Sequence, residues 1–255
     1  MIGPTVLVLA QHNDATTDLV VDALHSRNAD VVRVDTADFP RLVQLSVRPD
    51  LLDSPGWLQS GTRRTDLCTV HSVYRRHPAR FTFPDSLSGP EKKFAMLESV
   101  AGFGGALTAQ SWRWIDSPGA VADASYKPRQ LRVAASCGMN VLRTLVTNDA
   151  ASVRTFAATV GDIVYKSLST GVVTEQDELR IIYTRRVTVD QLDDATISTC
   201  CHLFQEWIPK IYDVRMTVVG DRVFPVAIHS CDTAAASRSP ARVNSKVVLA
   251  GHELF

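Results

Sequence analysis

The 255-residue chain has no excess of charge of either sign. Lysine plus arginine and aspartate plus glutamate number 27 each, so the formal net charge is zero. Proteins that bind nucleic acid usually carry a basic excess, and we therefore expect no nucleic-acid partner. The five cysteines are odd in number and have no regular spacing, which favours a reducing compartment over a disulfide framework. Cys200 and Cys201 are adjacent and lack the two-residue gap typical of zinc sites, so we predict no metal role for them.

Long apolar runs are also absent. The run from Val6 to Ala10 is too short to cross a membrane, and no basic leader precedes it. It is typical of a buried parallel strand. We expect no membrane partner and a cytoplasmic protein, whose length allows one large domain or roughly two to three small ones.

Residues 6–35 predict a β-α-β unit. After the first strand, Thr16 or Thr17 is suited to cap a helix, and residues 31–35 give a second strand. The connecting loop, residues 11–14, contains no glycine, so the glycine-rich fingerprint of dinucleotide-binding proteins is absent. We interpret this unit as scaffold.

The next part of the chain changes pattern. Residues 42–74 form short alternating runs, which predict antiparallel strands added to the parallel unit. A basic cluster, residues 75–77, follows; it could bind an anion, but we favour a solvated strand end. Pro90 then starts a predicted helix. Its apolar face is expected to contain Phe94, Leu97, Val100 and Ala101.

Two lysines stand where a cation could meet phosphate. Lys127 precedes Pro128 at the start of a predicted helix, where backbone N–H groups also favour anions. Lys166 ends the apolar strand 163–166 and is followed by the small, polar loop 167–171. That loop lacks the P-loop pattern, and the spacing around Lys127 fits a surface lysine equally well.

The stretch from His202 to His229 carries the strongest local pattern. It contains Gly220-Asp221, a two-residue turn signal between two alternating runs. Arg215 lies in the first run among apolar residues. Its guanidinium would suit a phosphate or a carboxylate, and an edge hairpin with Arg215 in solvent fits the spacing equally well.

In these segments the chain resembles the ATP-grasp ligases, and more narrowly those that cyclise ribosomal peptides of the microviridin (graspetide) type. The order and spacing of the motifs together carry the resemblance. They are F-Q-E-W-I-P-K at residues 204–210, D-V-R-M-T-V-V-G-D-R-V-F at 213–224, V-Y-R-R-H-P at 73–78, K-P-R-Q-L at 127–131 and W-I-D-S-P at 114–118, the last with Asp116 where the family usually has asparagine.

The resemblance implies an α/β ATP-grasp fold. We expect an N-terminal β-α-β-containing (pre-ATP-grasp) domain over residues 1–126, a central lid domain over residues 127–203 and a truncated C-terminal part over residues 204–255. The family's late acidic residue and terminal E-x-N motif, which hold Mg²⁺, have no match after His229. The resemblance covers roughly residues 5–230, and we expect the C-terminal segment to be lost or replaced.

The implied activity is ATP-dependent macrocyclisation of a ribosomal precursor peptide. A peptide carboxylate would attack the γ-phosphate of ATP, and a Ser/Thr hydroxyl or Lys amine would then attack the acyl phosphate to give an ester or amide crosslink. The implied cofactors are ATP and Mg²⁺, although the metal ligands have no match in this chain. The implied partner is the leader and acidic core of the precursor, with the leader docked on the lid. A homodimer is left open.

The resemblance also implies roles for single residues. Lys127 and Lys166 would hold phosphates, and Asp213 would lie on the ribose side. Arg215 would be the catalytic residue, because a guanidinium stabilises charge that develops on the transferring phosphoryl or acyl phosphate. The adenine-binding hinge is expected to comprise Gln205, Glu206 and Ile208.

Two other functions stay open from the sequence. A catalytically inactive, truncated ATP-grasp protein would bind only nucleotide or leader peptide; the missing terminal motif favours it, whereas Lys127, Lys166 and Arg215 favour the enzyme. A different carboxylate–amine ligase, such as a glutamate ligase, would share the hinge and Arg215. The segments at residues 73–78 and 127–131 favour the peptide ligase.

Overall fold

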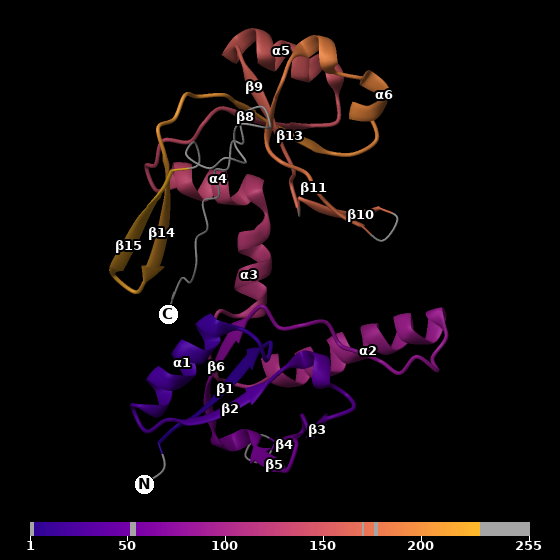
Figure 1. Ribbon diagram of the computed structural model, residues 1–255, viewed down its shortest axis with the longest axis vertical. Helices are drawn as coiled ribbons and strands as arrows, with labels where there is room; N and C mark the ends of the chain where they lie inside the picture. The colour runs from indigo at the N-terminus through magenta and orange to yellow at the C-terminus, as the bar shows by residue number, and fades with distance from the viewer. Residues whose placement is uncertain (1–2, 52–54, 170, 176–177, 230–255) are drawn as a thin grey trace. The chain divides into compact units, whose positions relative to one another are not determined.

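The computed structural model describes residues 3–51, 55–169, 171–175 and 178–229 (Figure 1). The chain divides into two compact units, Met1–Ser117 and Pro118–Phe255, and both combine helices with sheets. Within the described residues, no helix has the length and apolar character needed to cross a membrane. The finer division into three domains and the cytoplasmic location stay predictions.

The first unit is built on a four-stranded sheet with the strand order β2-β1-β6-β7. β1 (Thr5–Ala10) is buried along its whole length and pairs in parallel with β2 (Asp30–Val34) and β6 (Val70–Arg76). β6 pairs in parallel with β7 (Arg113–Ile115). α1 (Ala15–His25) connects β1 to β2, which confirms the predicted β-α-β unit.

Asp14, and neither of the two threonines proposed from the sequence, caps α1. Its carboxylate accepts a hydrogen bond from the backbone N–H of Thr17 at 2.8 Å. Arg76, at the end of β6, donates from Nε to the two carboxylate oxygens at 3.0 and 3.2 Å. The Thr17 N–H, followed by the Arg76 guanidinium, lowers the pKa of Asp14. The solvated position expected for the basic cluster is therefore wrong for Arg76, because this carboxylate holds its side chain within the fold.

A second, antiparallel sheet belongs to the same unit. It has the order β3-β4-β5 and follows the short 3₁₀ turn Thr36–Asp38. The predicted antiparallel strands are confirmed for residues 43–66. The prediction is wrong for residues 70–74, because they belong to β6 of the parallel sheet. A second 3₁₀ turn, Leu67–Thr69, leads into β6. The three strands are β3 (Val43–Val47), β4 (Gly56–Ser60) and β5 (Arg63–Asp66).

The long helix α2 (Gly89–Thr108) buries residues of its second half and not the apolar residues expected from the sequence. Ser88 and Glu91 form a capping box at its start, and Phe103 and Leu107 pack into the core with the sheets. Phe94, Leu97 and Val100, which the periodicity had placed on the core face, are exposed. Figure 1 shows one end of α2 extending away from the strands. The helix continues through the glycines because its second half carries the buried side chains.

The second unit contains a four-stranded antiparallel sheet with the order β12-β9-β13-β8. α5 (Ala150–Val160) packs Val153 and Ala157 against it, in a cluster that includes the fully buried Phe204. The strands are β8 (Thr144–Thr147), β9 (Ile163–Lys166), β12 (Arg185–Val187) and β13 (His202–Glu206).

Short helices and two strand pairs surround this sheet. The helices are α3 (Pro118–Ser125), α4 (Lys127–Ser136), the 3₁₀ turn Val189–Gln191 and α6 (Asp194–Ile197). β10 (Val172–Glu175) pairs with β11 (Glu178–Ile181), and β14 (Asp213–Val219) pairs with β15 (Arg222–Ile228). Gly220 has a φ of 54°, which confirms the hairpin turn read from the sequence. The part of the expected C-terminal region after residue 229 lies outside the described residues.

Candidate functional site

Lys166 lies at the centre of the candidate site. It is the last residue of β9, and its Nζ donates to Oε1 of Gln205 on β13 at 2.6 Å. Gln205 pairs with Val164, so its side chain and that of Lys166 share one face of the sheet. Burial lowers the pKa of Lys166 to about 8; the ammonium groups of Lys210 and Lys127 lower it as well, and the carboxylate of Asp213 opposes them.

Gln205 connects Lys166 to β8. Its side-chain Nε2 donates to Oγ1 of Thr144 at 2.8 Å, and the Thr144 hydroxyl donates to the carbonyl of Leu142 at 2.8 Å. Gln205 is 6% exposed. Each end of its amide therefore has a hydrogen-bond partner within the protein, Lys166 at the oxygen and Thr144 at the nitrogen.

Two further lysines lie close to Lys166. Lys127, the first residue of α4, donates from Nζ to the carbonyls of Leu168 and Ser169 at 2.5 and 3.1 Å. These bonds connect the start of the helix to the loop after β9. Lys210 donates to the carboxylate of Asp213 at 2.5 Å. Sequence reasoning missed Lys210, although the lysine that ends the segment at residues 204–210 was a signal for it.

The electrostatics of this cluster favour an anion. The cations of Lys210 and Lys127 both act on Lys166, and the carboxylate of Asp213 opposes them there. Because like charges raise the free energy of the ammonium forms, a phosphate placed among them would relieve repulsion. The residues present thus fit the phosphates of a nucleotide.

The hinge residues after Gln205 have partners of their own. The carboxylate of Glu206 accepts from the backbone N–H of Arg143 at 2.9 Å and from its Nε at 2.6 Å. These bonds, the backbone one first, lower the pKa of Glu206. The indole of Trp207 lies under the Arg186 guanidinium, 3.9 Å from the ring centroid. The side chain of Ile208 is exposed, so an adenine at this hinge would meet Ile208 more readily than the Glu206 carboxylate.

Arg215 lies two residues after Asp213 on β14, and the two side chains share one face of the strand. Arg215 pairs with Val226 and its side chain is exposed. The structure thus brings together Lys127, Lys166, Gln205 and Asp213. Arg215 is close in the sequence to Asp213 alone, and its side chain is exposed.

Metal ligands are not gathered in this way. Over the residues that the structure describes, no group of three or more His, Cys, Asp or Glu side chains could hold a metal ion. Asp213, the carboxylate nearest the lysines, is paired with Lys210. The described residues therefore fit the phosphates of a nucleotide but do not by themselves fit Mg²⁺.

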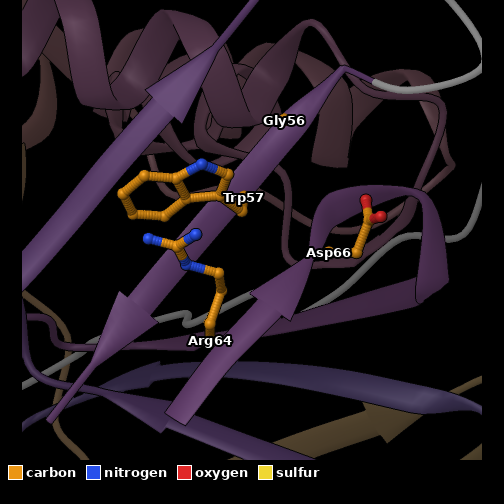
Figure 2. Close-up of a pocket in the computed structure, with 4 residues that line it drawn as sticks. All are labelled: Gly56, Trp57, Arg64 and Asp66. Carbon is orange, nitrogen blue, oxygen red and sulfur yellow. The ribbon is translucent and has the colours of Figure 1, made fainter. Parts of the chain in front are cut away.

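A small surface cavity of about 350 Å³ lies in the first unit, on the β4–β5 strand pair. It is lined by Gly56, Trp57, Arg64 and Asp66. Figure 2 shows the Arg64 guanidinium lying over the Trp57 indole, 3.8 Å from the ring centroid. The guanidinium covers one face of the indole, and we assign no ligand to this cavity.

Comparison with known proteins agrees with the fold. Residues 5–122 match the family model described as the MvdD pre-ATP grasp domain. The macrocyclase MdnB from Microcystis aeruginosa MRC is 31% identical, with a TM-score of 0.73 over 89% of this chain and 75% of that one. The macrocyclase MdnC from the same organism, solved with the precursor peptide MdnA, is 27% identical, with a TM-score of 0.80 over 89% of this chain and 75% of that one.

A third structure shares the fold. The RiPP-associated ATP-grasp ligase of Chryseobacterium gregarium, solved with ADP and a leader and core peptide, is 23% identical, with a TM-score of 0.84 over 91% of this chain and 71% of that one. No curated protein gives a significant match. The chain belongs to the ATP-grasp ligases that mature ribosomal peptides. The predicted family and the α/β ATP-grasp fold are thereby confirmed.

Proposed function

We propose that the chain is an ATP-dependent carboxylate ligase that macrocyclises a ribosomal precursor peptide. The observation that carries the proposal is the lysine cluster around Lys166, whose lowered pKa reflects a cation held partly out of water beside two others. MdnB and MdnC, which share this fold over most of the chain, are macrocyclases. The C. gregarium ligase was solved with ADP.

In this proposal Lys127 and Lys166 hold the phosphates of ATP. At pH 7 a lysine with a pKa of about 8 is mostly charged, and the approach of a phosphate would raise that pKa further. Lys127 already connects the start of α4 to the loop after β9, so its ammonium lies beside the loop that follows Lys166. The exposed Ile208 and the hinge backbone would contact adenine, and Asp213 would lie on the ribose side.

The chemical step is phosphoryl transfer followed by acyl transfer. A carboxylate oxygen of the peptide attacks the γ-phosphorus, the bond to the β-phosphate oxygen breaks, and ADP leaves. A hydroxyl or amine of the same peptide then attacks the acyl carbon, loses its proton and expels inorganic phosphate, which leaves an ester or amide. Arg215, exposed on β14, would stabilise the charge that develops on the transferring phosphoryl group. Magnesium, when bound, offsets phosphate charge, and we assign it no ligand here.

We propose that the peptide docks on the lid through its leader. The β10–β11 ladder supports this, because Val172 and Ile181 are paired across it and both side chains are exposed, and neighbouring exposed apolar groups can mark an interaction surface. The acidic core would then reach the lysine cluster. MdnC was solved with its precursor peptide, which supports a peptide partner in this fold.

A homodimer is a further proposal for the first unit. α2 exposes Phe94 at 65%, Leu97 at 60% and Val100 at 56%. The small residues Ala101 and Gly105 continue this face at helical spacing, so two antiparallel copies would place bulky side chains against small ones. A Phe94→Ser, Leu97→Ser double variant is expected to be monomeric by light scattering under conditions where the wild-type chain is dimeric. A monomeric wild-type chain at about 100 μM would contradict the proposal.

A nucleotide- or peptide-binding protein without catalysis is the second candidate. It is favoured by the lack of a metal-binding group of side chains within the described ranges. The two candidates share the lysine cluster and differ in whether the bound peptide is dehydrated, because each ester or amide crosslink removes one water from the peptide.

The first experiment is calorimetry of ATP binding with and without magnesium. Lys166→Ala is the test variant, and Lys93→Ala, an exposed lysine on α2, is the matched control. We expect binding to be lost only in Lys166→Ala; a folded wild-type chain that does not bind ATP would refute the ligase. Mass spectrometry of a precursor peptide incubated with the chain and ATP then separates the candidates. Loss of water supports the ligase, and binding without loss of water supports the second candidate.

A further inference from the structure

Thr144 and Gln205 form a hydrogen-bonded pair whose direction is determined. The Thr144 hydroxyl gives its single proton to the carbonyl of Leu142 at 2.8 Å, so its oxygen can only accept from the amide of Gln205. The amide nitrogen must then face Thr144, at 2.8 Å, and the amide oxygen must face Lys166, at 2.6 Å. The Lys166 ammonium, which can only donate, requires the same orientation from the other end of the amide.

The orientation of the Gln205 amide affects the charge of Lys166, because the amide is buried next to the ammonium group. Gln205 is buried on the central strand β13, so water cannot readily replace a lost partner. An amide turned the other way would aim its N–H₂ group at the Lys166 ammonium, and two donors facing each other repel. The charged groups that act on Lys166 are Lys127 on α4, and Lys210 and Asp213 from the segment after β13.

We propose that Thr144 and Gln205 are positioning residues, which direct the Lys166 ammonium and favour its charged form without contacting the ligand themselves. This inference rests on the proposed function in one respect, which is that the ligand of Lys166 is a nucleotide phosphate. It changes the role of Gln205 from the nucleotide contact expected from the sequence to a support for Lys166. It also assigns a role to Thr144, which no motif indicated.

The test measures the titration of Lys166 in the nucleotide-free protein. The chain is labelled with ¹³C at the lysine ε-carbon, the Lys166 signal is assigned by its loss in Lys166→Arg, and the signal is followed from pH 6 to pH 11. Thr144→Val keeps the side-chain shape and removes the hydroxyl acceptor, whereas Thr144→Ser loses a methyl group and keeps the hydroxyl. We expect the pKa of Lys166 to fall by about one unit in Thr144→Val and to stay unchanged in Thr144→Ser.

Binding of magnesium–ATP provides the second readout. At pH 8 a fall of about one unit would reduce the charged fraction of Lys166 from about one half to about one tenth, so ATP should bind roughly five-fold more weakly to Thr144→Val. At pH 6.5 the two proteins should bind alike. A purely structural role would weaken binding equally at both pH values.

The outcomes separate this inference from the proposed function. An unchanged pKa of Lys166 in a folded Thr144→Val variant, or a loss of ATP binding that is independent of pH, would overturn the positioning role. If the pKa of Lys166 changes as expected but the wild-type protein does not bind ATP, the positioning role of Thr144 and Gln205 is supported and the nucleotide site is refuted. If Thr144→Val does not fold, Gln205→Glu decides, because a carboxylate beside the ammonium should raise the pKa of Lys166 by about one to three units. An unchanged pKa there would also refute the inference.

Discussion

Replacement of Lys166 by methionine should reveal the cost of holding this cation in the protein without its ligand. Burial lowers the pKa of Lys166 from the 10.5 of an ordinary lysine to about 8, which corresponds to roughly 3 kcal/mol of destabilisation at pH 7. Methionine removes this penalty but leaves Oε1 of Gln205 without its donor, at a cost of about 1–3 kcal/mol. We therefore expect Lys166→Met to be as stable as the wild type at pH 7, or more stable by about 2 kcal/mol.

The pH dependence is the stronger part of this prediction. Between pH 8 and 10.5 the unfolded chain keeps the lysine proton and the folded chain has released it, so the stability of the wild type rises with pH over this window. Below pH 8 both states are protonated and the penalty is constant. The stability of the wild type relative to Lys166→Met should therefore increase by roughly 2.5 kcal/mol between pH 7 and 10.

Urea unfolding followed by circular dichroism at pH 7, 8, 9 and 10 measures this difference. Lys93→Met, which replaces an exposed lysine on α2, is the control and should show no such change. A constant difference between wild type and Lys166→Met across this range would refute the reasoning, because it would mean that Lys166 titrates alike in the folded and unfolded chain.

Three further predictions concern the scaffold and the hinge. Gly56→Ala should lower the free energy of unfolding by more than about 3 kcal/mol, because Gly56 has a φ of 137° and an added Cβ would lie 2.0 Å from a main-chain oxygen of β3. The control is Gly61→Ala, which also has a positive φ but has open space around the added Cβ. Thermal unfolding should show a smaller loss of stability for Gly61→Ala than for Gly56→Ala. Phe204→Ala should cost about 3–5 kcal/mol, since Phe204 is fully buried in the core of the second unit; a smaller loss in urea unfolding would mean that this core repacks. Glu206→Gln should be less stable than the wild type at pH 7, and the two should converge as pH falls through the lowered pKa of Glu206, which the Arg143 N–H depresses; parallel melting curves from pH 7 to pH 3 would contradict this.

Local sequence patterns were sufficient to predict the elements that depend on neighbouring residues alone. The apolar run of β1, the β-α-β unit and the glycine turn between β14 and β15 were all predicted correctly, because strand periodicity and a positive φ leave direct signs in the sequence. The motifs from residues 73 to 224 also identified the family. Lys127, Lys166, Gln205 and Asp213 were named as site residues, and they do lie together.

The tertiary structure decided which faces are buried and which partners each polar group has. Periodicity groups Phe94, Leu97 and Val100 on one face of α2, but the helix meets the core further along the chain, at Phe103 and Leu107, which follow Val100 at helical spacing. The bonds from Gln205 to Lys166 and Thr144 join residues 39 and 61 positions apart. Such pairs depend on strand order and register, which the packing of the whole sheet determines. The sequence alone thus determined the family and indicated Lys127 and Lys166 as cations of the candidate site, and the folded sheet determined which groups surround Lys166.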